Sequence, residues 1–373
     1  MPRNLQSSAR LPEARRRCAA ALERVRASRQ YSDGRFHNLS KAGPGIKGNP
    51  LPLLGEYFFR RGERMPAIEL PVHDPRAAWA QTPDSPFRVT WLGHSTLLLE
   101  IDGLRILTDP VFGLRASPVS FAGPRRFHPV PAPIAALPEL DAVLLSHDHY
   151  DHLCQASIRE LAARDVPFVT ALGVGAHLEA CGVPPERIHE LDWNERIDLP
   201  GVRFSATPAQ HFSGRSVSDR NATLWASWVI ETERHRCFFS GDTGLFPELS
   251  EIGRQHGPFD LVMLEIGAFH PAWGDIHLGP DNAHRAFHML QGKLFMPVHW
   301  GTFNLALHDW HQPAERLFNL AAGSGTRLLL PRLGLPAEPE RERHTSAWWR
   351  EFRAPQAEDD VNDLSPLEVE EAR

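Results

Sequence analysis

The stretch AVLLSHDHYDH, residues 142–152, joins an apolar run to a short loop that holds three histidines and two aspartates. The apolar run predicts a buried β-strand, so the loop after it lies at the edge of a sheet, where ligand sites commonly form. His147 and His149 are one residue apart and can face one side, while Asp151 and His152 can face a second point. Imidazole and carboxylate ligands together suit zinc, with iron or manganese as weaker alternatives. The loop therefore predicts a metal site.

Three residues further along the chain are candidates to complete that site. His211 follows VRFSATPAQ, Asp242 lies in FFSGDTG and His299 lies in LFMPVHWGT. Each comes at the end of an apolar β-type run, as the loop at 146–152 does. A lone histidine is usually a surface or core residue, but this ordered set of seven groups is far less expected by chance. We therefore expect the seven side chains to converge on a pair of cations.

Strand-type and helix-type segments alternate from residue 86 onward, which indicates a layered α/β architecture. Asp102-Gly103 is a hairpin signal between two strand-type runs. Helices are expected over 155–165, 281–290 and 314–321, the second of them opened by Asp281 as a cap. Strands are expected within 87–93, 96–101, 104–109, 142–146, 167–171, 202–209, 224–231, 236–244, 260–268, 293–302 and 326–334.

The two ends of the chain differ from its middle in composition. Residues 1–30 carry eight Arg against two Glu, and residues 356–373 carry seven acidic residues against one Arg. We divide the chain into a basic segment with a Pro/Gly-rich wrap (1–85), a central α/β domain (86–334) and an acidic tail (335–373). The tail is expected to be poorly ordered, unless Trp348 and Trp349 anchor it on the body.

Composition excludes several classes of protein. The chain has 373 residues and a formal net charge of −6, so no global basic field favours nucleic acid as a partner. Its four cysteines form no CxxC pair and predict free thiols rather than a disulfide framework. No run of 18 apolar residues is present, and charges interrupt any candidate signal segment. We expect a cytoplasmic protein. Peripheral contact with a membrane and formation of a homodimer are both compatible with the sequence.

The chain resembles the metallo-β-lactamase superfamily of binuclear metallohydrolases, and within it the N-acylphosphatidylethanolamine-hydrolysing phospholipase D group. That resemblance implies a four-layer αββα sandwich with the site at the joined sheet edges, here preceded by an irregular N-terminal extension. The similar segments run in order between about residues 91 and 305, and are WLGHSTLLLEIDGLRILTDPVF, RASPVSFAGPRRF, DAVLLSHDHYDHL, LWASWVI, FFSGDTG, EIGRQHGPFDL and VHWGTF.

The resemblance also implies a role for each candidate ligand. Two Zn²⁺ are expected per chain, with iron or manganese as the alternatives. Asp151 is expected to be catalytic as well as a ligand. One zinc would be held by His147, His149 and His211, the other by Asp151, His152 and His299, with Asp242 between them.

Five other residues near these motifs have two interpretations each. His277 aligns with a histidine that family members place beside the metals, so it is either the general acid or a loop histidine bonded to backbone. Asp109 resembles a buried acid that orients a ligating imidazole, although an Asp-Pro turn is the alternative. His94 is expected to be a hydrogen-bonded support, with a ligand role as the alternative. Arg125 and Arg126 would either bind a substrate phosphate or lie in a solvated basic loop.

Such a metal pair predicts hydrolysis. Two zinc ions roughly 3.5–4 Å apart lower the pKa of a shared water and make hydroxide available near neutral pH. The leading expectation is a phosphodiesterase in which this hydroxide attacks the phosphorus of N-acylphosphatidylethanolamine. The alternative is hydrolysis of another small ester, lactone or cyclic phosphodiester. A di-iron redox or binding module is less compatible, because relatives of that kind carry an acid where His149 stands.

A basic amphipathic helix over 12–29 could contact an anionic bilayer.

Overall fold

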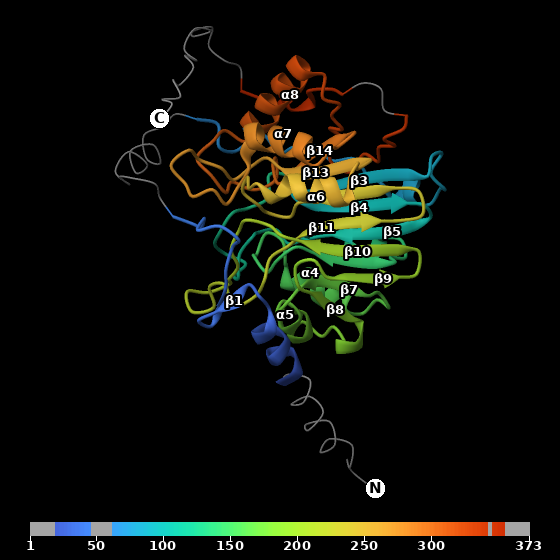
Figure 1. Ribbon diagram of the computed structural model, residues 1–373. Coiled ribbons are helices and arrows are strands. Elements are labelled where there is room, and N and C mark those ends of the chain that lie inside the picture. The colour runs from blue at the N-terminus through green and yellow to red at the C-terminus, as the bar shows by residue number, and fades with distance from the viewer. Residues whose placement is uncertain (1–18, 46–61, 342–344, 355–373) are drawn as a thin grey trace.

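Two six-stranded sheets lie face to face in the computed structural model, which describes residues 19–45, 62–341 and 345–354 (Figure 1). The first sheet contains, in spatial order, β3 (Phe87–Gly93), β4 (Thr96–Ile101), β5 (Leu104–Thr108), β6 (Ala142–Leu145), β7 (Phe168–Ala171) and β8 (Ile188–Leu191). The second contains β14 (Phe295–Val298), β13 (Leu261–Glu265), β12 (Arg236–Phe239), β11 (Ser227–Glu231), β10 (Val202–Thr207) and β9 (Arg196–Leu199). A small ribbon of β1 (Tyr31–Ser32) and β2 (Arg35–Phe36) precedes them.

Each sheet combines antiparallel hairpins with a parallel half. Strands β5 to β8 are parallel, and so are β12 to β14. The carboxyl ends of parallel strands meet at one edge of a sheet, so the loops that follow them gather there. At the opposite edge, β4 turns into β5 through Asp102 and Gly103, which have φ of 50° and 86°. Positive φ at both positions is what an Asp-Gly hairpin turn favours, and the predicted hairpin is confirmed.

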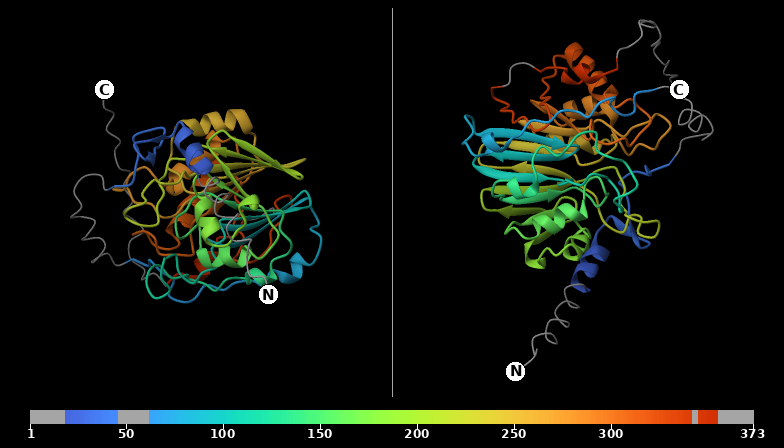
Figure 2. Two further views of the ribbon diagram at one scale, coloured as in Figure 1. Left: turned by 90° about the horizontal axis from the view of Figure 1, so that it is seen from below. Right: turned by 180° about the vertical axis from the view of Figure 1, so that it is seen from behind.

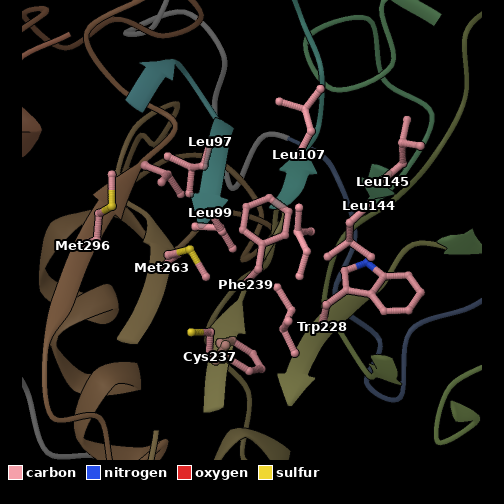
Figure 3. Close-up of a cluster of buried hydrophobic side chains, with 14 of the residues drawn as sticks. Leu97, Leu99, Leu107, Leu144, Leu145, Trp228, Cys237, Phe239, Met263 and Met296 are labelled. Atoms are coloured by element: carbon pink, nitrogen blue, oxygen red, sulfur yellow. The ribbon is translucent and has the colours of Figure 1, made fainter. Parts of the chain in front are cut away.

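The core lies between the two sheets. Figure 3 shows Leu99 of the first sheet near Phe239 and Met263 of the second, and all three side chains are fully buried. Every residue of β3, β4, β6, β12, β13 and β14 is buried except Arg236. Strands covered on both faces have continuous apolar sequences rather than alternating ones. This explains why their sequences could be assigned as strands.

Helices cover the outer faces of the sheets, so the predicted αββα sandwich is confirmed (Figure 2). Helix α5 contacts β8, and α7 contacts β13 as well as α6 and α8. The remaining helical turns lie in connections. The helical elements are α3 (Arg76–Trp79), α4 (Gln155–Leu161), α5 (Gly175–Ala180), α6 (Glu248–His256), α7 (Gly279–Met289), α8 (Gln312–Ser324), η1 (Ile134–Ala136), η2 (Pro185–Arg187) and η3 (Trp348–Phe352), besides a helix at 19–27.

Two details of the sequence interpretation are wrong. The strand expected over 326–334 is only an isolated bridge between Leu328 and Phe295, since Pro331 has no N–H to continue a ladder. Asp281 does not cap α7, because Leu278 occupies the cap position. Asp281 lies in the first turn instead and pairs with Arg316 at 2.7 Å.

The segment after residue 334 is packed on the body where it is described, so the expectation of a poorly ordered tail is wrong for 335–341 and 345–354. The Ala337 N–H donates to Val89 O at 2.8 Å. Trp348 and Trp349 are 2% and 0% exposed, and the indole N–H of Trp349 donates to Glu315 at 2.9 Å. The tryptophan pair is thus an anchor. Residues 355–373 lie outside the described part of the chain.

The described part of the N-terminal basic segment also packs on the body. Arg24 donates to Glu190 O at 2.7 Å and pairs with Glu195, while Val25 is buried. Leu22 is exposed, and residues 12–18 of the expected amphipathic helix lie outside the described ranges. Within the described ranges, no helix has both the length and the apolar content needed to cross a bilayer.

Candidate metal centre

Three histidines converge at the end of β6. His147 Nε2 lies 2.8 Å from His149 Nδ1, and His149 Nδ1 lies 3.2 Å from His211 Nε2. His211 comes from the connection that follows β10 in the other sheet, and its side chain is 1% exposed. The face-to-face packing of the sheets therefore brings together residues that are more than sixty positions apart in the sequence.

A second group lies beside the first. His299, directly after β14, places Nε2 3.3 Å from Asp151 Oδ2, and His152 Nε2 lies 3.7 Å from the same oxygen. His94 Nε2 contacts that oxygen too, at 3.1 Å. His94 is thus in contact with a candidate ligand, as expected of a supporting histidine, but it also offers a nitrogen to the group. In each group the ligand atoms lie within 4.8 Å of one another.

Asp242 lies between the two groups. Its Oδ1 is 3.1 Å from His152 Nε2 and its Oδ2 is 3.2 Å from His299 Nε2. The same Oδ2 is 3.6 Å from His211 Nε2 and 3.9 Å from His147 Nε2. One carboxylate thus faces nitrogens of both groups.

The donor set fits a pair of metal ions. His152 Nε2, Asp242 Oδ1 and His299 Nε2 are buried, yet none of them makes a hydrogen bond. Unsatisfied buried polar atoms are costly, and bound cations would satisfy these three. His147 Nε2 and His211 Nε2 both lie at hydrogen-bond distance from His149 Nδ1. Because His211 Nδ1 donates to Ile276 O, a neutral His211 has a lone pair and no proton at this contact. Imidazole and carboxylate ligands are the ones zinc favours.

Hydrogen bonds on the far side of the ligands orient the imidazoles. Asp109 is fully buried, and its Oδ2 accepts from His152 Nδ1 at 2.6 Å while its Oδ1 accepts from Ser146 N at 2.7 Å. His211 Nδ1 donates to Ile276 O at 2.9 Å. In both histidines the remaining nitrogen, Nε2, is directed toward the centre. This is the arrangement in which outer partners set the tautomer of a metal ligand.

Backbone strain accumulates around these residues. His94, Asp109 and His299 have φ of 53°, 31° and 62°, in the left-handed region that non-glycine residues seldom adopt. Gly241 also has positive φ, and a Cβ there would lie 2.4 Å from Ser146 Cβ. Only glycine allows the turn that carries Asp242 to approach the histidine loop so closely. Strain of this kind is typical of functional sites.

Glu265 is a site residue that the sequence interpretation missed. It ends β13, is fully buried, and accepts from His277 Nδ1 through Oε2 at 2.9 Å. The signal was an acid at the end of the apolar run LVMLE, the same pattern that identified Asp242. Glu265 and His277 also form a third ligand group with Asp242 and His299.

The local charges shift the pKa values of these groups. Burial by itself lowers the pKa of His277, but the Glu265 carboxylate outweighs it and raises that pKa above its usual value. Burial raises the pKa of Asp242, yet the imidazoles of His152 and His299 hold it well below its usual range. Asp242 is therefore ionised and able to bind a cation near neutral pH.

The two arginines expected to bind phosphate are not part of these groups. Arg126 is 6% exposed and donates to the backbone oxygens of Val111 at 2.7 Å and Leu92 at 2.8 Å. Its Nη1 and Nη2 thus hold two loops together. Arg125 pairs through its backbone with Arg115.

Comparison with known proteins places the chain in a family. Residues 104–300 match the family model described as the beta-lactamase superfamily domain. An uncharacterised protein of Mycobacterium tuberculosis is 44% identical over 329 residues, which cover 87% of this chain and 88% of that protein. An N-acyl-phosphatidylethanolamine-hydrolyzing phospholipase D of Caenorhabditis elegans is 34% identical, over 67% of this chain and 74% of its own.

A solved structure supports the same fold. The isothiocyanate hydrolase from Delia radicum gut bacteria superposes with a TM-score of 0.54 and 23% identity, covering 67% of this chain and 98% of the other. Together with the paired ligand groups, these matches show that the chain belongs to the β-lactamase superfamily, as a metal-dependent hydrolase of the metallo-β-lactamase fold.

Proposed function

We propose that this chain is a binuclear zinc-dependent phosphodiesterase of the phospholipase D type, which hydrolyses N-acylphosphatidylethanolamine to phosphatidate and an N-acylethanolamine. The position of Asp242 is the observation that carries the proposal. Its two oxygens face imidazoles of both ligand groups at 3.1 to 3.9 Å, as a carboxylate shared by two cations requires. One zinc would be held by His147, His149 and His211, and the other by Asp151, His152 and His299.

The chemistry follows from these positions. When bound, two zinc ions supply Lewis acidity toward the phosphoryl oxygens and lower the pKa of water toward neutrality. The protein contributes orientation: Asp109 and Ile276 O fix the ligating nitrogens of His152 and His211 before substrate arrives. A site organised in advance stabilises the charge that develops on the phosphoryl oxygens without further reorganisation.

His277 is proposed to protonate the leaving oxygen. Its ring centroid lies 5.0 Å from that of His211 and 5.5 Å from that of His299, and its side chain is 14% exposed. Glu265 binds Nδ1, so Nε2 is the nitrogen that can act on substrate. The carboxylate also stabilises the protonated imidazole, which is the form a general acid needs.

A lipid substrate is supported by the names of two relatives. The Caenorhabditis elegans relative and a Saccharomyces cerevisiae relative, 33% identical over 66% of this chain, are both named as phospholipases of this type.

Parallel assays test the substrate. The zinc-loaded chain is incubated with N-acylphosphatidylethanolamine vesicles and with bis-p-nitrophenyl phosphate, and release of N-acylethanolamine is followed by mass spectrometry. We expect turnover of the lipid. Turnover of only the soluble diester would favour the alternative, a hydrolase of smaller esters or cyclic phosphodiesters. Bound iron with a visible absorption band and no hydrolysis would instead favour a redox module.

A further inference from the structure

The segment that follows the helix at 19–27 runs along the metal centre, and its residues 28–45 are here called the N-terminal strap. It lies outside the part of the chain that matches the family model, which begins at residue 104. The strap is fixed near its middle by Phe36, whose side chain is fully buried. The Phe36 N–H donates to Asn221 O at 2.8 Å, and Asn221 Nδ2 donates to Phe36 O at 3.0 Å. In Figure 1 the strap, in blue at β1, lies beside the loop that contains Asn221.

Asn38 in this strap holds the backbone of His211 on both sides. Its Oδ1 accepts from His211 N at 3.0 Å, and its Nδ2 donates to His211 O at 2.8 Å. The same Oδ1 accepts from the indole N–H of Trp225 at 3.1 Å, and Nδ2 also donates to Ala42 O at 2.8 Å. Two donors therefore meet the oxygen and two carbonyls meet the nitrogen, which fixes the orientation of the amide.

His211 depends on these contacts because it lies outside a strand. β10 ends at Thr207 and β11 begins at Ser227, so no neighbouring strand pairs with the His211 backbone. The residue is 1% exposed, so water does not readily replace a lost partner. A buried backbone group without a hydrogen bond costs about 1–3 kcal/mol. The Asn38 side chain thus substitutes for the missing neighbouring strand.

The strap makes a second connection to the same histidine. Ser40 Oγ donates to Gln210 Oε1 at 2.7 Å, and Gln210 Nε2 donates to Asp275 O at 2.7 Å. Gly274 N donates to Gly45 O at 2.9 Å. This loop leads directly to Ile276, whose oxygen orients the His211 imidazole. The strap therefore supports both the backbone and the ring partner of one ligand.

We propose that the N-terminal strap is a structural part of the metal centre and that Asn38 is a positioning residue for His211. The proposal rests on the proposed function in one respect, that His211 is a metal ligand. Asn38 acts through His211 and does not touch the metal. Loss of the Asn38 side chain would weaken binding of the ion held by His147, His149 and His211 more than binding of the second ion.

The test is Asn38→Ala in the full chain, with Leu39→Ala as the control because Leu39 is an exposed neighbour in the same strap. Zinc content is measured after dialysis against graded concentrations of a chelator. Wild type and control are expected to keep two zinc ions at a chelator concentration that leaves the variant with one. Mutating a residue that hydrogen-bonds a metal ligand changes metal affinity by about 10–100-fold. The dissociation constant of the zinc ion held by His147, His149 and His211 should therefore rise by that factor.

Zinc rescue separates positioning from a general folding defect. The kcat of Asn38→Ala should recover when free zinc is raised above its new dissociation constant, whereas damage unrelated to the metal would not recover. If Asn38→Ala does not fold, Asn38→Asp, which retains an acceptor toward His211 N–H, is expected to shift zinc affinity in the same direction. Wild-type zinc affinity in a folded variant would overturn the strap proposal alone. A wild-type chain that never holds two metal ions would overturn the proposed function, and this inference with it.

Discussion

Asp109 shows how one buried carboxylate determines the geometry of a ligand. It has no solvent contact, and three hydrogen bonds satisfy its oxygens: from Ser146 N, Ser146 Oγ and His152 Nδ1, at 2.6 to 2.7 Å. Burial raises the pKa of this carboxyl. His152 and the donors of Ser146 oppose that rise, so the carboxyl is sensitive to the loss of any of them.

We predict that Asp109→Asn lowers zinc affinity and kcat by about 10–100-fold, because an amide has one acceptor oxygen and cannot accept from both Ser146 N on one side and His152 Nδ1 on the other. Asp141→Asn is the control, since Asp141 is exposed and bonds Arg105 N at a distance from the centre. Isothermal titration with zinc compares the two. Equal affinities would show that Asp109 does not orient His152.

A substitution at His277 should distinguish a role in proton transfer from a role in metal binding. His277→Ala is expected to lower kcat about 10²–10⁴-fold while two metal ions remain bound, because a general acid contributes that much to a rate. His189→Ala on β8 is the matched control, remote from the centre. Full activity with normal metal content would remove the proton-donor role. Loss of a metal ion would instead mean that His277 is a ligand, as the third ligand group allows.

At the level of elements, the hairpin ends opposite the metal centre are joined by Asp102. Its carboxylate accepts from Thr232 Oγ1 at 2.6 Å, Arg234 N at 3.0 Å and His235 Nδ1 at 3.0 Å, all in the turn between β11 and β12. Burial tends to raise the pKa of Asp102, but these donors outweigh it and lower that pKa to about 2. The contact therefore ties the first sheet to the second.

The sign of this shift predicts a pH dependence. The pKa of Asp102 in the folded protein lies below its unfolded value of about 3.9. The contribution of this carboxylate to stability is therefore complete above about pH 4 and is lost as pH falls through 2. Asp102→Asn retains the turn preference and is expected to lower the free energy of unfolding by about 2 kcal/mol near pH 7. Denaturant unfolding at several pH values measures it. A difference that stays constant down to pH 2 would contradict this account.

The sequence located most strands because they are buried on both faces and have continuous apolar sequences. It missed β8 and β9, IHEL and RIDL, which are short, half-polar and lie at the sheet edges. Edge strands are stabilised by pairing with a neighbour rather than by their own pattern. The helix α5 was missed for a related reason, as its six residues are too few for a periodic signal.

At the level of the whole molecule, the C-terminal segment covers the back of the metal centre. Trp348 and Trp349 pack on Trp300, with ring centroids 5.7 and 5.5 Å away, and Trp300 directly follows the candidate ligand His299. Trp91 stacks on Trp300 at 5.2 Å, and its ring centroid lies 6.4 Å from that of Trp348. These contacts join parts of the chain that are far apart in the sequence. Local composition does not reveal such contacts, and it therefore suggested a loose tail.

Trp349→Ala is therefore expected to lower the free energy of unfolding by about 3–5 kcal/mol, as other large truncations in a core do. Phe121→Ala is the control, since that ring is 82% exposed and its removal should change stability by less than about 0.5 kcal/mol. Thermal and denaturant unfolding compare the two variants. Equal stability would mean that the segment is not anchored in solution.

The order of the ligands along the chain could be predicted because each follows an apolar strand. Their mutual distances could not, since they depend on how the two sheets face each other. The sequence interpretation missed Asn38, Glu265 and Asp148, because each makes its hydrogen bonds to residues that are distant in the sequence. Asp148, for example, holds the histidine loop by accepting from Gly214 N and Thr223 Oγ1, each at 2.9 Å.

Metal stoichiometry of Asp242→Ala against wild type tests the shared-carboxylate account most directly. Elemental analysis of the purified full chain should give two zinc ions per wild-type molecule. The variant should hold one or fewer, because both groups lose the oxygens that face them. Two tightly bound ions in the variant, or a wild-type chain that binds at most one, would contradict a centre built around Asp242.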